Sequence, residues 1–120
     1  MQLQESREMY LETIFILSQK SGSVRSDDIT EYMGYSKPSV SRAVGLLKSG
    51  GYLTMAEDGL LSLTEEGRTA AKKIFERHTV LSQFLIHIGV SIETATQDAC
   101  KLEHAISDES LNAIKEYFKI

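Results

Sequence analysis

Apolar residues recur every three or four positions along most of the chain, which is the spacing of helices with one buried face. The first such segment covers residues 5–19. Its apolar stripe consists of Tyr10, Ile14 and Leu17. Ser26 is an N-cap residue followed by two acids, so a second, short helix is predicted from there to Met33. Two helices separated by a tight connection therefore open the chain.

A third helix is predicted from Ser36, with Pro38 in its first turn, to Ser49. Its inward positions are Val40, Val44 and Leu47. The pattern then changes to short extended segments at residues 52–55 and 60–63, joined by a tight turn that ends in glycine. This change predicts a β-hairpin directly after the third helix.

Helical spacing returns after the hairpin. Thr64 is predicted to cap a long helix over residues 65–87, whose first turn contains two glutamates. Further helices are predicted over residues 91–105 and 109–118. The fold class is therefore mainly α with one small β-hairpin.

A helix pair followed by a hairpin is typical of the winged helix-turn-helix, in which the second helix of the pair enters the DNA major groove. We expect residues 1–64 to form this DNA-binding domain. Residues 65–120 should form a helical dimerisation domain, because a regulator with one reading head per chain needs twofold symmetry to match a palindromic site. The same residues are expected to form the metal-binding domain, since four of the candidate metal ligands described below belong to them. Its apolar candidates for the dimer interface, some of which must serve the chain's own core, are Ile88, Val90, Leu111, Ile114 and Phe118.

Composition agrees with a small globular regulator. The chain has 120 residues, 42% hydrophobic and 25% charged, which argues against disorder, and its apolar runs are too short to span a membrane. One cysteine cannot form an intrachain disulfide, so a cytoplasmic location is expected. The net charge is −4, yet the stretch from Gly34 to Gly50 contains three cations and no acid. A local basic face for an anionic partner is one interpretation, and a chance run of solvated cations is the other.

The third helix combines hydroxyls and cations at its outward positions, groups that suit phosphate and base contacts. The candidate DNA-binding residues are Ser36, Lys37, Pro38, Ser39, Arg42 and Lys48. The alternative is a plain surface helix in an unrelated fold.

Three places carry possible metal ligands. Met9 and Glu12 share one face of the first helix, and His78 lies on the apolar stripe of the long helix, where a lone histidine is more often a core residue than a ligand. A third set, Cys100, Glu103 and His104, falls on one helix face, opposite an apolar stripe that includes Ala95, Ala99, Leu102 and Ile106. A buried structural cysteine beside a surface Glu-His pair is the alternative.

Four segments together resemble the diphtheria toxin repressor family of metal-activated, dimeric winged-helix repressors. They are Glu8–Leu11, Ser36–Ser41, Arg77–His78 and Asp98–His104. The resemblance covers nearly the whole chain and is closest in length to the short manganese-type members, without the SH3-like domain of the longer iron-type members. It implies that the position of Pro38, like those of Ser36, Ser39 and Arg42, contacts DNA.

The resemblance also implies a ligand set. Met9, Cys100, Glu103 and His104 match the activating site of iron-type members, and Glu12 and His78 match ligands of the manganese-type binuclear site. Manganese-type members carry carboxylates at the positions of Met9 and Cys100. Because sulfur ligands suit Fe(II) better than hard Mn(II), we expect an Fe(II)-responsive repressor, with Mn(II) as the alternative.

Other function classes fit the sequence less well. A winged-helix regulator that senses an organic ligand or an oxidant through Cys100 would not need the other five candidate ligands. A metal-dependent hydrolase would need a nucleophile, an acid–base pair and a substrate cleft, none of which is legible in the sequence. We therefore expect a DNA-binding regulator and not an enzyme.

Overall fold

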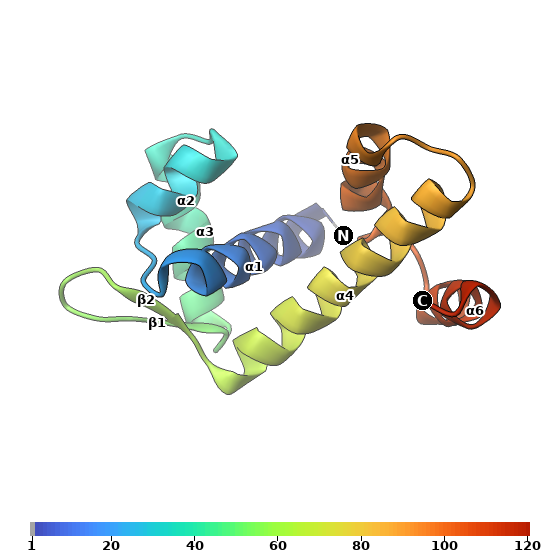
Figure 1. Ribbon diagram of the computed structural model, residues 1–120. Coiled ribbons are helices and arrows are strands. Elements are labelled where there is room, and N and C mark those ends of the chain that lie inside the picture. Colours follow the sequence, from blue (N-terminus) through green and yellow to red (C-terminus); the bar gives the residue numbers. More distant parts are fainter. Residues whose placement is uncertain (1) are drawn as a thin grey trace. The chain divides into compact units, whose positions relative to one another are not determined.

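The computed structural model describes residues 2–120, with side chains from Ser6 onward, and confirms a mainly helical chain with one β-hairpin (Figure 1). Its elements are α1 (Gln2–Ser21), α2 (Ser26–Met33), α3 (Lys37–Ser49), β1 (Leu53–Met55), β2 (Leu61–Leu63), α4 (Glu65–His87), α5 (Ile92–Leu102) and α6 (Asp108–Phe118). The chain divides into two compact units, one ending at Lys72 and the other covering Lys73–Ile120, so the division falls within α4. Among the described residues, no helix is both long and apolar enough to cross a membrane.

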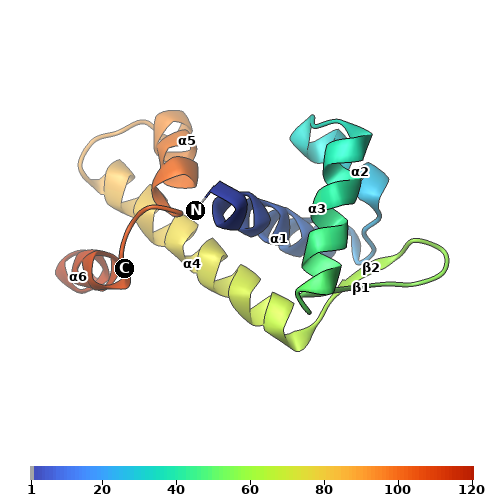
Figure 2. The ribbon, with the colours of Figure 1, turned by 180° about the vertical axis from the view of Figure 1, so that it is seen from behind.

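The first unit has the architecture predicted for a winged helix-turn-helix. Helix α1 packs against α2 and α3, and α3 also contacts β1. The predicted inward residues lie in one core, where Leu17 is partly buried and the others are fully buried: Tyr10, Ile14, Val40, Val44 and Leu47. The loop between β1 and β2 projects away from the three helices in both views (Figures 1 and 2). A helix pair and a projecting hairpin therefore share one apolar core.

The N-termini of α2 and α3 are capped in different ways. The predicted start of α3 at Ser36 is confirmed: Ser36 is the N-cap, and its Oγ accepts the N–H of Ser39 at 3.3 Å. The prediction that Ser26 caps α2 is wrong by one residue, since Arg25 occupies the N-cap position with extended backbone. The Asp28 carboxylate accepts the N–H of Arg25 at 2.8 Å. This contact from the first turn allows a residue without a capping side chain to begin the helix.

The start of α4 is tied to the segment before the hairpin. Thr64 is confirmed as the cap, because its Oγ1 accepts the N–H of Gly67 at 3.0 Å and donates to the Gly51 carbonyl at 2.7 Å. Gly67 is buried, and a Cβ atom built there would collide with the Tyr52 carbonyl. Only glycine lets the first turn of α4 approach this backbone so closely.

In the second unit, α4, α5 and α6 contribute to a small apolar core. Its buried members are Val80, Leu81, Ala99 and Leu111. Helix α5 ends at Leu102, short of the predicted end at Ala105, and residues 103–105 form a turn. The turn forms because the N–H groups of Ala105 and Ile106 both donate to the Leu102 carbonyl. The prediction that Leu102 belongs to the buried stripe is wrong, since it is 41% exposed at this helix end.

Candidate metal centre and nucleic-acid interface

The carboxylate of Glu103 is buried in the protein, with 1% of the residue exposed. Glu103 is the C-cap of α5, where the backbone still has helical angles. Taking an ionised carboxylate out of water costs several kcal/mol unless positive charge or hydrogen-bond donors compensate. The groups around Glu103 therefore determine whether its carboxylate is compensated within the protein or can bind a cation.

One oxygen of Glu103 is held by a histidine of the neighbouring helix. Its Oε1 lies 2.9 Å from Nδ1 of His78 on α4. The same nitrogen lies 3.7 Å from Sγ of Cys100, which is almost one helical turn before Glu103 on α5. One potential ligand atom from each of these three residues lies within 4.8 Å of the other two. The second unit alone thus brings together a thiol, an imidazole and a carboxylate.

The other oxygen of Glu103 has no hydrogen-bond partner among the described residues. This atom, Oε2, is buried, and Nε2 of His104 lies 3.6 Å from it. The His104 side chain is 3% exposed. The carboxylate therefore lies between two imidazoles, with one oxygen towards each. A buried carboxylate oxygen that lacks a partner needs an explanation, and a cation on that side would satisfy it.

These four residues fit a divalent transition-metal ion. Thiolate, imidazole and carboxylate are the ligand types used for iron, manganese and zinc, and two of them are anionic when bound to a metal. The alternative expected from sequence, a buried cysteine beside a surface Glu-His pair, is wrong. Cys100 is exposed, whereas Glu103 and the side chain of His104 are buried. The exposed thiol is accessible to an incoming ion.

The other two candidate ligands belong to the first unit. Met9 and Glu12 are three residues apart on α1, and Met9 is half-buried. Both lie within the continuous helix α1, where the Met9 carbonyl also accepts the Thr13 hydroxyl at 2.9 Å. Tyr10 and Ile14 occupy the buried face of the same helix. The second unit thus assembles four of the six predicted ligands, and the remaining two share a helix in the first.

The predicted DNA-binding residues occupy the exposed face of α3. All six are exposed: Ser36, Lys37, Pro38, Ser39, Arg42 and Lys48. The opposite face of α3 is buried through Val40, Ala43, Val44 and Leu47. No acid lies in the first turn, and Lys48 lies in the last. The helix is therefore fixed by one face and offers the other to an anionic partner.

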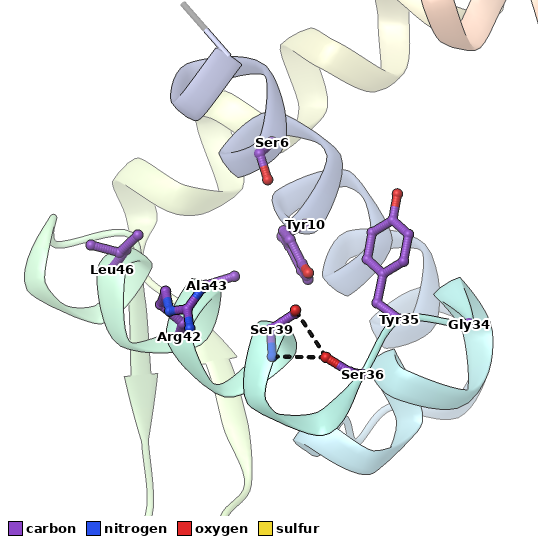
Figure 3. A pocket seen from close by; sticks show the side chains of 9 residues that line it. All are labelled: Ser6, Tyr10, Gly34, Tyr35, Ser36, Ser39, Arg42, Ala43 and Leu46. Atoms are coloured by element: carbon purple, nitrogen blue, oxygen red, sulfur yellow. Dashed lines mark hydrogen bonds between the residues drawn. The ribbon is translucent and has the colours of Figure 1, made fainter.

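A hollow of about 680 Å³ lies beside the N-terminal half of α3 (Figure 3). Helix α1 contributes Ser6 and Tyr10 to its wall, and α3 and the residues before it contribute Tyr35, Ser36 and Arg42. The rings of Tyr10 and Tyr35 are 6.1 Å apart between centroids. Burial raises the pKa of the Tyr10 hydroxyl, and the neighbouring Tyr35 raises it further. The wall combines hydroxyls and one cation with the apolar side chains of Ala43 and Leu46.

Two residues near the centre, Arg77 and Asp108, have no role predicted from the sequence. The Arg77 guanidinium donates to the Glu103 carbonyl and to the Asp108 carboxylate. Both partners lie far along the chain from Arg77, so no helical spacing links them to it. The one available signal was the position of Arg77 beside His78 in a segment that resembles the family.

Comparison with known proteins covers both units. Residues 2–61 match the family described as "Iron dependent repressor, N-terminal DNA binding domain", and residues 64–119 match "Iron dependent repressor, metal binding and dimerisation domain". The chain is 35% identical over 106 residues to the transcriptional regulator MntR of Escherichia coli O6:H1, covering 88% of this chain and 68% of that one. It is 33% identical over 108 residues to the diphtheria toxin repressor of Corynebacterium diphtheriae, covering 89% of this chain and 48% of that one.

The fold is also similar to solved structures. One, described as a manganese-dependent transcriptional repressor in complex with manganese, has a TM-score of 0.85 and 27% identity, covering 92% of this chain and 51% of the other. This chain therefore spans about half the length of that protein and of the diphtheria toxin repressor.

Proposed function

Since the chain belongs to the diphtheria toxin repressor family of iron-dependent repressors, we propose that it is a metal-dependent repressor that binds an operator in double-stranded DNA as a dimer. The observation that carries the proposal is the buried Glu103 carboxylate, which has one oxygen on His78 and the other without a hydrogen-bond partner. A cation bound there would satisfy the buried oxygen that lacks a hydrogen-bond partner.

The ligand assignment has two parts. His78, Cys100, Glu103 and His104 are supported by their distances within the second unit. Met9 and Glu12 are assigned by residue type and by their match to the family's ligand positions. When bound, the ion supplies the positive charge that compensates the buried carboxylate. Glu103 would offer one oxygen on the side of His78 and the other on the side of His104. The exposed Cys100 would offer a soft thiolate ligand.

We assign Fe(II) as the activating metal, with Mn(II) as the alternative. Affinity rises from Mn(II) to Fe(II) for most sites, so the type of ligand decides selectivity. The Cys100 sulfur lies 3.7 Å from the His78 nitrogen, which supports a thiolate among the ligand atoms. Met9 would add a thioether. The solved structure described as a manganese-dependent repressor keeps Mn(II) as the alternative.

The DNA contacts are assigned to the exposed face of α3. Arg42 is the residue proposed to read a base, because a guanidinium can donate two hydrogen bonds to guanine. Lys37 and Lys48 are proposed to contact phosphates. Residues 1–64 would be the DNA-binding domain and residues 65–120 the dimerisation and metal-binding domain. The meeting of the two family matches between residues 61 and 64 supports this boundary.

Dimerisation is assigned to the second unit. Leu111, one of the candidates named from sequence, serves the core of the unit itself. Ile88 is 56% exposed, and Ile92 and Tyr117 are 71% and 82% exposed. Exposed apolar side chains in such number support an interface with a second copy. Sedimentation velocity at micromolar concentration should show a dimer, and a monomer both with and without metal would contradict it.

Metal and DNA would be coupled through differential affinity for one arrangement of the protein. An ion that favours the DNA-competent arrangement raises DNA affinity, and DNA must then tighten metal binding by the same factor. The experiment is a DNA-binding titration under anaerobic conditions with Fe(II), Mn(II) or chelator. Fe(II) should activate binding most strongly, and Met9→Asp should shift the response towards Mn(II). Activation by Mn(II) but not Fe(II) would overturn the iron assignment alone.

A further inference from the structure

Two consecutive residues of α4 contact Glu103, one at its side chain and the other at its backbone. His78 contacts the side chain, with Nδ1 2.9 Å from Oε1. Arg77 contacts the backbone, with its guanidinium donating to the Glu103 carbonyl at 3.0 Å. One turn of α4 therefore fixes both the position of this residue and the direction of its carboxylate.

The guanidinium of Arg77 also holds the turn that follows. It donates to the Ile106 carbonyl at 2.6 Å and to the Asp108 carboxylate in the first turn of α6. The Arg77 side chain is only 15% exposed. Carbonyls at a helix C-terminus lack intrahelical partners and favour a cation nearby, so this placement satisfies the end of α5. Arg77 thus joins α4, the end of α5 and the start of α6.

We propose that Arg77, anchored by Asp108, is a positioning residue of the metal centre: it holds the turn from Glu103 to Ile106 so that the Glu103 carboxylate stays between His78 and His104. This inference rests on the function proposed above. The planar guanidinium donates in several fixed directions at once, which a lysine ammonium on a flexible stem does not reproduce. The ligand geometry is then present before an ion arrives, and little ordering remains to be done on binding.

The chain offers a matched control. Lys73 also pairs with Asp108, with Nζ 3.5 Å from the carboxylate, but it is 63% exposed. No hydrogen bond from Lys73 to the Glu103–Ile106 turn is found among the described residues. Lys73→Gln removes a positive charge beside the Asp108 carboxylate, while Arg77 still donates to the carbonyls of the turn. Asp108 is itself 62% exposed, so Asp108→Asn removes the anchor without disturbing the apolar core.

The test is an anaerobic titration with Co(II) alone, followed by absorption spectroscopy, on the full chain. Arg77→Gln should weaken Co(II) binding by about 10–100-fold, the usual effect of removing a partner that orients a ligand. It should also change the Co(II) spectrum at saturation. Asp108→Asn and Arg77→Lys should give smaller effects of the same kind. Lys73→Gln should match wild type, and melting without metal should be recorded for every variant.

The outcomes separate the inference from the proposed function. If wild type gives no Co(II) spectrum, the assignment of the metal centre is wrong, and the positioning role of Arg77 is then wrong as well. If wild type binds Co(II) but Arg77→Gln and Asp108→Asn bind it with unchanged affinity and spectrum, only the positioning role is wrong. Lower melting temperatures with an unchanged spectrum would mean a purely structural role and would also overturn it. Should Arg77→Gln not fold, Asp108→Asn decides between these outcomes.

Discussion

Replacing Glu103 by glutamine should separate the stability of the fold from its response to metal. The substitution keeps the shape of the side chain and an oxygen that can accept from His78 Nδ1. It puts an amide NH2 group in place of the buried oxygen that has no hydrogen-bond partner. A buried polar atom without a partner costs about 1–3 kcal/mol in either form, but the neutral amide avoids the larger cost of burying a charge. Without metal, the variant should therefore be at least as stable as wild type.

With metal bound, wild type should become more stable than Glu103→Gln. A ligand at about 100 times its Kd stabilises the folded state by about 2.7 kcal/mol, which is a shift in Tm of about 10 °C for a chain of this size. Wild type should show this shift with Co(II) or Fe(II) under anaerobic conditions. Glu103→Gln should show almost none, because the central carboxylate ligand is gone.

Thermal melts by circular dichroism, with and without metal, measure both effects. Glu116→Gln is the matched control, since Glu116 is an exposed residue of α6 that no described contact links to the centre. It should keep the full metal-induced shift. A metal-induced shift that Glu103→Gln keeps, or a variant that is unfolded without metal, would contradict a metal-binding role for this carboxylate.

Three further results are expected. Arg42→Ala should weaken DNA binding by roughly 1–3 kcal/mol and relax preference at one base pair, measured by fluorescence anisotropy against single-base operator variants. Gly67→Ala should lower the free energy of unfolding by about 1–3 kcal/mol in urea, whereas Gly45→Ala in α3, where a Cβ meets nothing within 4 Å, should not destabilise. The pKa of Asp58 is lowered from 3.8, chiefly by the hydrogen bond from the backbone N–H of Leu60. The ionised carboxylate therefore stabilises the folded state above pH 3.8, and this stabilisation is lost as the pH falls further. In acid titrations, Asp58→Asn should accordingly lose stability less steeply than wild type below about pH 4.

Local sequence rules predicted most of the fold. Helical spacing located the helices, and the hydroxyl of Ser36 and that of Thr64 marked two helix starts correctly. These features depend on neighbours within one turn, so they can be read from a single segment. The start of α2 was missed because a side chain inside the helix, Asp28, supplies the cap for Arg25. The end of α5 was missed because the turn after it is also held by Arg77 of α4, which donates to the carbonyls of Glu103 and Ile106.

The candidate site could be predicted in its residue types but not in its burial. Sequence identified Cys100, Glu103 and His104 as one face, yet burial depends on which helices cover that face. The structure buries Glu103 and leaves Cys100 exposed. The contact between Arg77 and the Glu103 carbonyl joins residues 26 positions apart, and no periodicity predicts it. Every residue has a backbone carbonyl, so the residue type at the acceptor position does not reveal a long-range hydrogen bond to it.

Selection of duplex DNA from a random-sequence pool, with and without metal, shows directly whether this protein binds DNA in a metal-dependent way. The wild-type chain is incubated with the pool under anaerobic conditions in Fe(II), in Mn(II) and in chelator, and the retained DNA is sequenced. We expect enrichment of a palindromic sequence in metal and none in chelator. Equal enrichment with chelator would contradict metal dependence, and no enrichment with any metal would contradict the assignment as a DNA-binding repressor.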